Sequence, residues 1–155
     1  MNIPFIKAHG AGNDFLFTFS SELPLNADHP AIARALCHRR TGVGADGWYL
    51  IDWPTPGADA KVRLWNSDGS YAELSGNGTR CAAAILVARQ HLGPALTIET
   101  GSGPKSLQLL EHNGDAMRFE MNVGEPRPHS GTGRFLLPLN GALLDVTLLD
   151  VGNPQ

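Results

Sequence analysis

The stretch SGNGTRCAAAILVARQH, residues 75–91, predicts the element around which the chain folds. We expect a helix from about Gly76 to His91 that ends before Gly93-Pro94, because glycine and proline commonly follow a helix end. Its middle, Cys81–Ala88, carries apolar side chains on every side. A helix without a polar face is normally buried all round. Since this helix is too short to cross a membrane, we expect strands to wrap around it.

The chain on either side of this helix is rich in short segments with strand character. One further helix is predicted at about Pro30–Arg40, because Asp28 can cap its start and Gly42 follows its end. Two Asn-Gly pairs, Asn113-Gly114 and Asn140-Gly141, predict hairpins whose turn residues both need positive φ. The predicted strands are Ile3–Ala8, Asp14–Phe19, Trp48–Trp53, Lys61–Trp65, Leu96–Thr100, Lys105–Glu111, Met117–Val123, Phe135–Leu139 and Leu143–Leu149.

The composition excludes several classes of protein. Of the 155 residues, 42% are hydrophobic and 17% are charged, which argues against disorder. The 18 glycines and 11 prolines predict many tight turns and argue against a helical bundle. A net charge of −3 argues against binding to nucleic acid or to a membrane surface. Two cysteines without a CxxC pattern, and no visible signal peptide, predict a cytoplasmic protein.

The segment Gly124–Gly133 is rich in proline, glycine and serine and is the best candidate for a linker. We therefore expect one domain over residues 1–125. Residues 126–155 are expected to be a linker and the first hairpin of an incomplete second domain. A piece of that size is too small to fold by itself, because below about 40 residues a core is rarely sufficient.

Two glycine-rich patterns lack the context that nucleotide-binding loops need. Gly42–Gly47 spells GxGxxG, but a helix is expected before it and a strand after it, which is the reverse of a dinucleotide-binding motif. Gly101–Ser106 has the wrong spacing for a P-loop, and Pro104 removes a backbone N–H. The six histidines are scattered without HxxxH spacing, so no metal site is expected.

Residues 61–81, KVRLWNSDGSYAELSGNGTRC, carry the strongest candidate site. Ser75 stands at or just before the helix N-terminus, where the N–H groups of Gly76, Asn77 and Gly78 carry a partial positive charge. Glycine also lets a ligand approach the backbone closely. The pattern predicts a small-anion site with a hydroxyl beside it. The alternative interpretation is that Ser75 only caps the helix and that the glycines only make a tight turn.

Five segments of the chain, taken in order, resemble the diaminopimelate epimerase family. They are Lys7–Phe15, Gly42–Gly47, Asn66–Ser70 continued by Gly76–Cys81, Met121–Pro126, and Gly152–Pro154. The resemblance covers the whole chain, but it extends to the N-terminal half of the family only.

The resemblance implies an α+β fold in which a mostly antiparallel, barrel-like sheet is wrapped around a central buried helix. This fold would be one of two similar halves, with an amino acid that has a free α-carboxylate bound between them. The family exchanges the α-proton between two cysteines on opposite faces, without pyridoxal phosphate, metal or other cofactor. Asn13, Asn66 and Asn153 match residues that bind the substrate, and the N–H groups of Gly76 and Asn77 match part of a carboxylate clamp.

Ser75 departs from the family, because it stands where the family has a catalytic cysteine. A thiol has a pKa of about 8.5, whereas a serine hydroxyl is far less acidic and is a poor base without a basic neighbour. The chain also stops at Gln155, directly after the Gly152–Pro154 match, before the half that holds the second cysteine. This chain without its second half is therefore not expected to turn over substrate.

Two functions follow as expectations. The first is the N-terminal part of a diaminopimelate epimerase-type isomerase of lysine biosynthesis, with Ser75 at the catalytic position. The alternative is a non-catalytic half-domain that binds an amino acid or carboxylate, as a homodimer or paired with a second half. Neither expectation includes a nucleic-acid or membrane partner.

Overall fold

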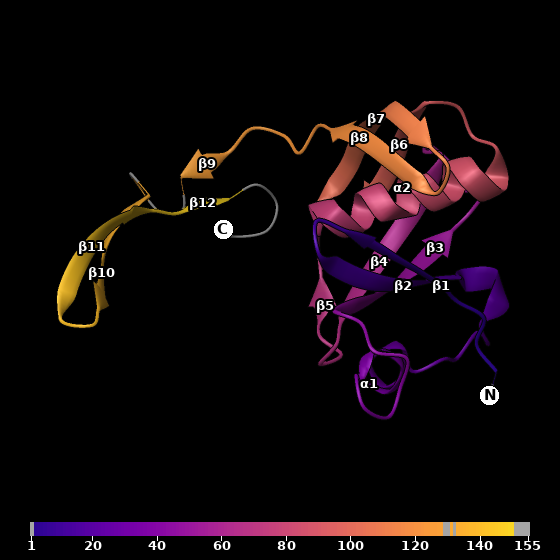
Figure 1. Ribbon diagram of the computed structural model, residues 1–155, viewed down its shortest axis with the longest axis horizontal. Coiled ribbons are helices and arrows are strands. Elements are labelled where there is room, and N and C mark those ends of the chain that lie inside the picture. Colours follow the sequence, from indigo (N-terminus) through magenta and orange to yellow (C-terminus); the bar gives the residue numbers. More distant parts are fainter. Residues whose placement is uncertain (1, 129–130, 132, 151–155) are drawn as a thin grey trace. The chain divides into compact units, whose positions relative to one another are not determined.

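The computed structural model describes residues 2–128, 131 and 133–150 (Figure 1). The chain divides into two compact units, Met1–Asn122 and Val123–Gln155. None of the helices in the described ranges is both long and apolar enough to cross a membrane.

The first unit is built on one eight-stranded sheet. Its strands are β1 (Ile6–Gly10), β2 (Asn13–Phe19), β3 (Gly47–Asp52), β4 (Ala60–Asn66), β5 (Tyr71–Ala72), β6 (Ala95–Thr100), β7 (Gly103–Asn113) and β8 (Ala116–Met121). The strand order is β1-β2-β3-β4-β6-β7-β8, and β5 pairs with β4. Only the β2–β3 and β4–β6 pairs are parallel within this sheet, so the prediction of a mostly antiparallel sheet is confirmed.

Two helices, α1 (His29–Cys37) and α2 (Gly76–Gln90), cover opposite faces of the sheet, and a short 3₁₀ helix, Ser20–Glu22, follows β2. In β3, Tyr49 and Ile51 belong to the core that includes α2, whereas Trp48 and Leu50 belong to the core that includes α1. Successive side chains of a strand point to opposite faces. The continuous apolar run of β3 therefore supplies both cores at once.

The sheet curls around α2. This helix contacts β1 and β2 at one end of the strand order and β6 and β8 toward the other end. Figure 1 shows α2 with β7 and β8 on one side and β1 and β2 on the other. The prediction of an α+β fold with a curled sheet is therefore confirmed. Burial of the helix on every side is not confirmed, because Ala88 and Arg89 are exposed.

Local hydrogen bonds set the helix ends. Asp28 caps α1 as predicted, since its Oδ1 accepts from the Ala31 N–H at 3.0 Å. The helix ends at Cys37, earlier than the predicted Arg40. The His38 ring takes over the next turn, because its Nδ1 accepts from the N–H groups of Arg40 and Thr41, at 3.3 and 3.1 Å.

The first hairpin fixes where β2 begins. The sequence predicts a turn between two strands here, and the structure narrows it to Ala11 and Gly12, both with positive φ. Gly10 pairs with Asn13 across this turn. Asn13 therefore opens β2 at the tip of a tight hairpin.

The two Asn-Gly turns differ. In the second unit, β10 (Arg134–Leu139) and β11 (Ala142–Thr147) flank Asn140 and Gly141, and both turn residues have positive φ as predicted. In the β7–β8 hairpin, Asn113 pairs with Ala116, so the turn residues are Gly114 and Asp115. Of these only Gly114 has positive φ, because the strand pairing extends one residue further than predicted. The second unit also pairs β9 (Arg127–Pro128) with β12 (Leu149–Asp150).

Gly78→Ala should destabilise the fold. A Cβ at Gly78 would lie 2.4 Å from the Tyr49 ring, and Tyr49 is only 1% exposed and cannot move aside. We expect the free energy of unfolding in urea to fall by about 1–3 kcal/mol, despite the better helix propensity of alanine. Gly93→Ala is the control, because a Cβ there meets open space. Equal effects of the two substitutions would contradict the close contact.

Candidate functional site

The sheet brings Asn13 and Asn66 to the same end. Asn13 is the first residue of β2 and Asn66 is the last residue of β4. Asp46, just before β3, links the two segments: its Oδ2 accepts from Asn13 Nδ2 at 3.1 Å, and its carbonyl accepts from the Ser67 N–H at 3.1 Å. These contacts follow from the pairing of β3 with both β2 and β4.

Ser75 is the N-cap of α2. Its Oγ accepts from the Gly78 N–H at 3.2 Å, and its carbonyl accepts from the Thr79 N–H and the Thr79 hydroxyl, each at 2.9 Å. The Tyr49 hydroxyl also donates to this carbonyl at 3.3 Å. Within the described ranges, no His, Lys, Asp or Glu side chain is recorded in a hydrogen bond with Ser75 Oγ. The hydroxyl keeps its own hydrogen to donate and has no base beside it, so it is suited to give a proton rather than to take one.

The N–H groups of Gly76 and Asn77 open the helix and have no intrahelical partner. Within the described ranges, no other acceptor is recorded for either group. The positive end of the helix dipole coincides with them and favours an anion. The Asn77 side chain joins this end of the helix to the sheet, because its Nδ2 donates to Asn13 Oδ1 at 2.7 Å. Its Oδ1 accepts from Arg80 Nη2.

Asn66 is tied into the turn that follows β4. Its Nδ2 donates to Ser70 Oγ at 3.0 Å and its N–H donates to the Ser70 carbonyl at 2.8 Å. Asp68 closes the turn by accepting from both the N–H and the hydroxyl of Ser70. The structure therefore brings together five of the six predicted site residues at one end of the first unit. The sixth, Asn153, lies outside the described residues.

A charged cluster behind Asn13 was not predicted. Arg39 donates to both oxygens of Asp14, at 3.1 and 2.7 Å, and to Asp46 Oδ1 at 2.7 Å. The Lys7 ammonium pairs with Asp14 Oδ2 at 3.1 Å and donates to the Gly44 carbonyl at 2.7 Å. The hydrogen bond from Arg39 holds the pKa of Asp14 well below its usual range.

The sequence did carry a partial signal for this cluster. Lys7, Asp14 and Asp46 lie in segments that resemble the family, but spacing does not show that those segments meet. Arg39 was predicted to belong to the C-terminal end of a helix, whereas the structure places it after α1.

Neither cysteine is placed for chemistry. Cys37 and Cys81 are free and buried, and burial raises the pKa of each thiol to about 11. The nucleophilic and basic form of cysteine is the thiolate. Both residues therefore act as small apolar core side chains near neutral pH.

An open hollow of about 670 Å³ lies next to the site. It is found where β1 and β8 leave part of α2 uncovered. Arg80 and Gly10 line it, and a Cβ at Gly10 would lie 3.2 Å from the Asn77 carbonyl, so the hollow reaches the first turn of α2. Its other lining residues are Lys7, Ala8, His9, Ala11, Cys81, Ala84 and Asp115–Phe119.

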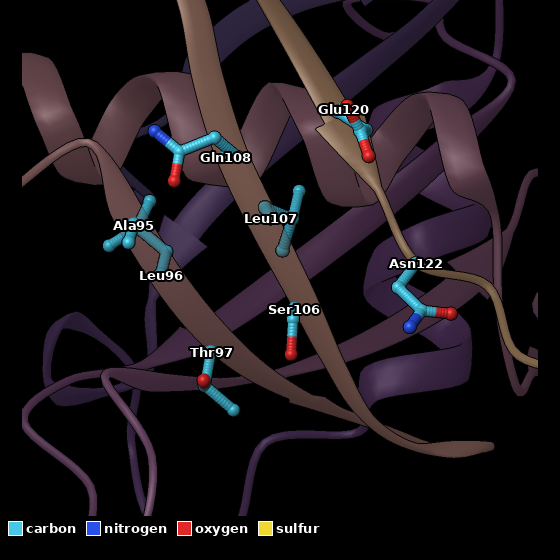
Figure 2. A pocket seen from close by; sticks show the side chains of 8 residues that line it. All are labelled: Ala95, Leu96, Thr97, Ser106, Leu107, Gln108, Glu120 and Asn122. Carbon is cyan, nitrogen blue, oxygen red and sulfur yellow. The ribbon is translucent and has the colours of Figure 1, made fainter.

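A second depression, of about 350 Å³, lies on the face of β6, β7 and β8 that points away from α2. Figure 2 shows Thr97, Ser106, Gln108 and Glu120 along these strands, with α2 behind them. None of the predicted site residues lines this depression. No group of three His, Cys, Asp or Glu side chains that could hold a metal occurs in the described part of the chain.

The segment Gly42–Gly47 follows α1 and leads into β3, whose first residue is Gly47, and this is the order that argued against a dinucleotide site. Its role is steric and local. A Cβ at Gly42 would lie 2.1 Å from the Ala35 carbonyl, so the segment must pass close to the helix before it delivers Asp46 to Asn13.

Comparison with known proteins gives consistent matches. The sequence profile described as diaminopimelate epimerase matches residues 5–128. A diaminopimelate epimerase from Pelotomaculum thermopropionicum is 38% identical over 163 residues, which cover 97% of this chain and 58% of the relative. One from Desulfitobacterium hafniense is 38% identical over 166 residues, which cover 97% of this chain and 57% of the relative. The chain thus spans a little under three fifths of the length of these curated relatives.

A solved structure shows the likeness of fold. A probable proline racemase from Agrobacterium radiobacter, with bound carbonate, has a TM-score of 0.71 at 16% identity. The match covers 96% of this chain and 49% of that chain.

Alkylation tests whether both thiols are buried in the folded chain. Because burial raises the pKa of Cys37 and Cys81 to about 11, both remain protonated at pH 8. We expect mass spectrometry to show no modification by iodoacetamide at pH 8 within the time that fully labels both residues in guanidinium chloride. Fast labelling of either thiol in the folded chain would contradict this assignment.

Proposed function

The chain belongs to the diaminopimelate epimerase family, and on that premise we propose that it is part of an isomerase that moves a proton at the α-carbon of an amino acid. The observation that carries the proposal is the N-terminus of α2. There the Ser75 hydroxyl, the N–H groups of Gly76 and Asn77, and the linked Asn13–Asn77 side chains lie together. Such a site suits a substrate that has an α-carboxylate.

The chemistry needs this kind of site. The α-proton of an amino acid is very weakly acidic, so its removal places negative charge on the α-carbon and the carboxylate. Preorganised N–H donors at a helix N-terminus stabilise charge that develops in the transition state. In this proposal the N–H groups of Gly76 and Asn77 hold the carboxylate, and Asn13 and Asn66 hydrogen-bond the rest of the amino acid. Asn153 would add a further hydrogen bond.

Ser75 serves as the proton donor in this proposal. Inversion needs a group on each face of the α-carbon, one to take the proton and one to give it. The Ser75 hydroxyl has a hydrogen to give but no basic partner in the described structure. The group that takes the proton must then lie outside the residues assigned to this site. We propose that residues 1–125 form the epimerase-like domain and that residues 126–155 begin a second one.

Diaminopimelate is the substrate that the family points to, and lysine biosynthesis in the cytoplasm is the setting we propose. Two free buried cysteines agree with a reducing compartment. The matches give no preference to a non-catalytic half-domain over an isomerase of this family. No pyridoxal phosphate or metal is required in this proposal.

Ligand binding by the chain tests the site. Diaminopimelate should raise the melting temperature, because a ligand at ten times its Kd adds about 1.4 kcal/mol to stability. Asn13→Ala should abolish the shift, since it removes the link to Asn77. Asn26→Ala is the control, because Asn26 is exposed and has no part in the site. An unchanged melting temperature up to saturating millimolar ligand would remove binding by this chain from the proposal.

Ser75→Cys tests the catalytic position. At the helix N-terminus the introduced thiol should have a pKa below about 8.5, because the helix dipole favours the thiolate. It should therefore react with iodoacetamide at pH 8, whereas Cys37 and Cys81 should not.

The same substitution has an expected catalytic outcome. When the chain is joined to the second half of the Pelotomaculum relative, Ser75→Cys should gain exchange of the diaminopimelate α-proton in D₂O, measured by NMR. The unsubstituted fusion is the reference. If the thiol ionises as expected but no exchange is gained, Ser75 is not the catalytic position.

A further inference from the structure

A continuous row of hydrogen bonds crosses the site from the helix to the sheet. Arg80 Nη2 donates to Asn77 Oδ1, and Asn77 Nδ2 donates to Asn13 Oδ1 at 2.7 Å. Asn13 Nδ2 donates in turn to Asp46 Oδ2 at 3.1 Å. Arg39 donates to the other oxygen of Asp46 at 2.7 Å. The two asparagines therefore stand between a guanidinium and a carboxylate.

The charged groups at the two ends determine which way the amides point. A carboxamide can rotate by 180° and exchange its donor for its acceptor, whereas a guanidinium can only donate and a carboxylate can only accept. Arg80 therefore requires the oxygen of Asn77, and this turns the Asn77 nitrogen toward Asn13. The Asn13 nitrogen must then face Asp46. This agrees with the carboxylate at that position, which can only accept a hydrogen bond. Reversing either amide would place a donor against a donor at one of its two contacts and an acceptor against an acceptor at the other.

We propose that Arg80 and Asp46 are positioning residues that fix the orientation of the Asn13 and Asn77 amides for the ligand. This inference rests on the proposed function, in which these asparagines lie at the substrate site. Each amide still has one N–H and one oxygen lone pair free after the bonds within the row. A reversed amide would present a lone pair where a carboxylate needs a donor. The row thus determines where the site offers an N–H donor to the amino acid and where it offers an oxygen acceptor.

Arg39 keeps the acceptor end in place. Asp14 and Asp46 are adjacent carboxylates that would repel each other, and Arg39 bridges them with three hydrogen bonds. Asp46 also accepts from the Asp14 N–H at 3.3 Å, which fixes its carboxylate relative to β2. The side chain of Arg39 is 58% exposed, so its contribution comes from geometry rather than from burial.

The orientation can be measured directly by NMR on the labelled chain. The side-chain amide protons of Asn13 and Asn77 should give well-separated signals that exchange slowly with water. In the double variant Asp46→Asn/Arg80→Gln, both end groups can donate and accept, so the amides can reverse and their signals should move toward averaged positions. Either single substitution leaves one charged end that still fixes both amides, and should keep the native signals. Asp46→Asn/Arg80→Lys keeps one donor-only end and should preserve the native signals.

Asp52→Asn is the matched control. It makes the same chemical change in the Arg63–Asp52 ion pair, which lies at the far end of β3. This variant should leave the Asn13 and Asn77 signals unchanged. If the double variant Asp46→Asn/Arg80→Gln also leaves them unchanged while the backbone spectrum stays native, the amides are not held by these ends and the inference is wrong.

Affinity then connects the row to the ligand. We expect the double variant Asp46→Asn/Arg80→Gln to weaken diaminopimelate binding by about tenfold, and Asp46→Asn/Arg80→Lys to retain affinity within about twofold. Unchanged affinity in variants whose amide signals have moved would overturn the positioning role. If the unsubstituted chain binds no diaminopimelate, the proposed binding by this chain fails, while the NMR comparison still decides whether the row fixes the amides.

Discussion

The packing of α2 into the curled sheet is the constraint on which the rest of the structure depends. Small residues permit it. Gly10 lets β1 pass close to Asn77 and Cys81, and Gly78 lets the Tyr49 ring lie against the helix backbone. The apolar side chains of the helix share one core with strands from both ends of the sheet. Because the helix is held from both sides, its N-terminus is fixed at the end of the sheet where β2 begins.

That position determines which side chains surround the N-terminus of α2. A capped helix N-terminus is common in proteins and is not by itself a binding site. Here the Asn77 side chain joins the first turn of α2 to Asn13 at the start of β2, and Asp46 and Arg39 continue the row behind Asn13. The serine at the cap can give a proton but has no base to receive one. In the proposed reaction, the first unit therefore supplies groups that bind the substrate and stabilise negative charge. Its described residues do not supply a base beside Ser75.

Much of the fold could be predicted because local patterns determine it. The Asp28 cap, the extent of α2 and most strands follow from propensity, capping and alternation over a few residues. Departures arose where one contact outweighed the local pattern. The His38 ring ended α1 early, and strand pairing moved the β7–β8 turn onto Gly114 and Asp115. Complete burial of α2 was predicted from its composition, but composition does not show how far a sheet curls.

The sequence by itself determined the identity of the helix, the cap at Ser75 and the anion-binding potential of Gly76 and Asn77, because these depend on neighbouring residues. The tertiary structure decided which partners these groups acquire. Asn13 and Asn77 are 64 positions apart, and Asn13 and Asp46 are 33 apart. Their meeting depends on strand register and on the depth at which α2 packs. These are properties of the whole core, so no local pattern could place Arg39, Asp46 and Arg80 around the site.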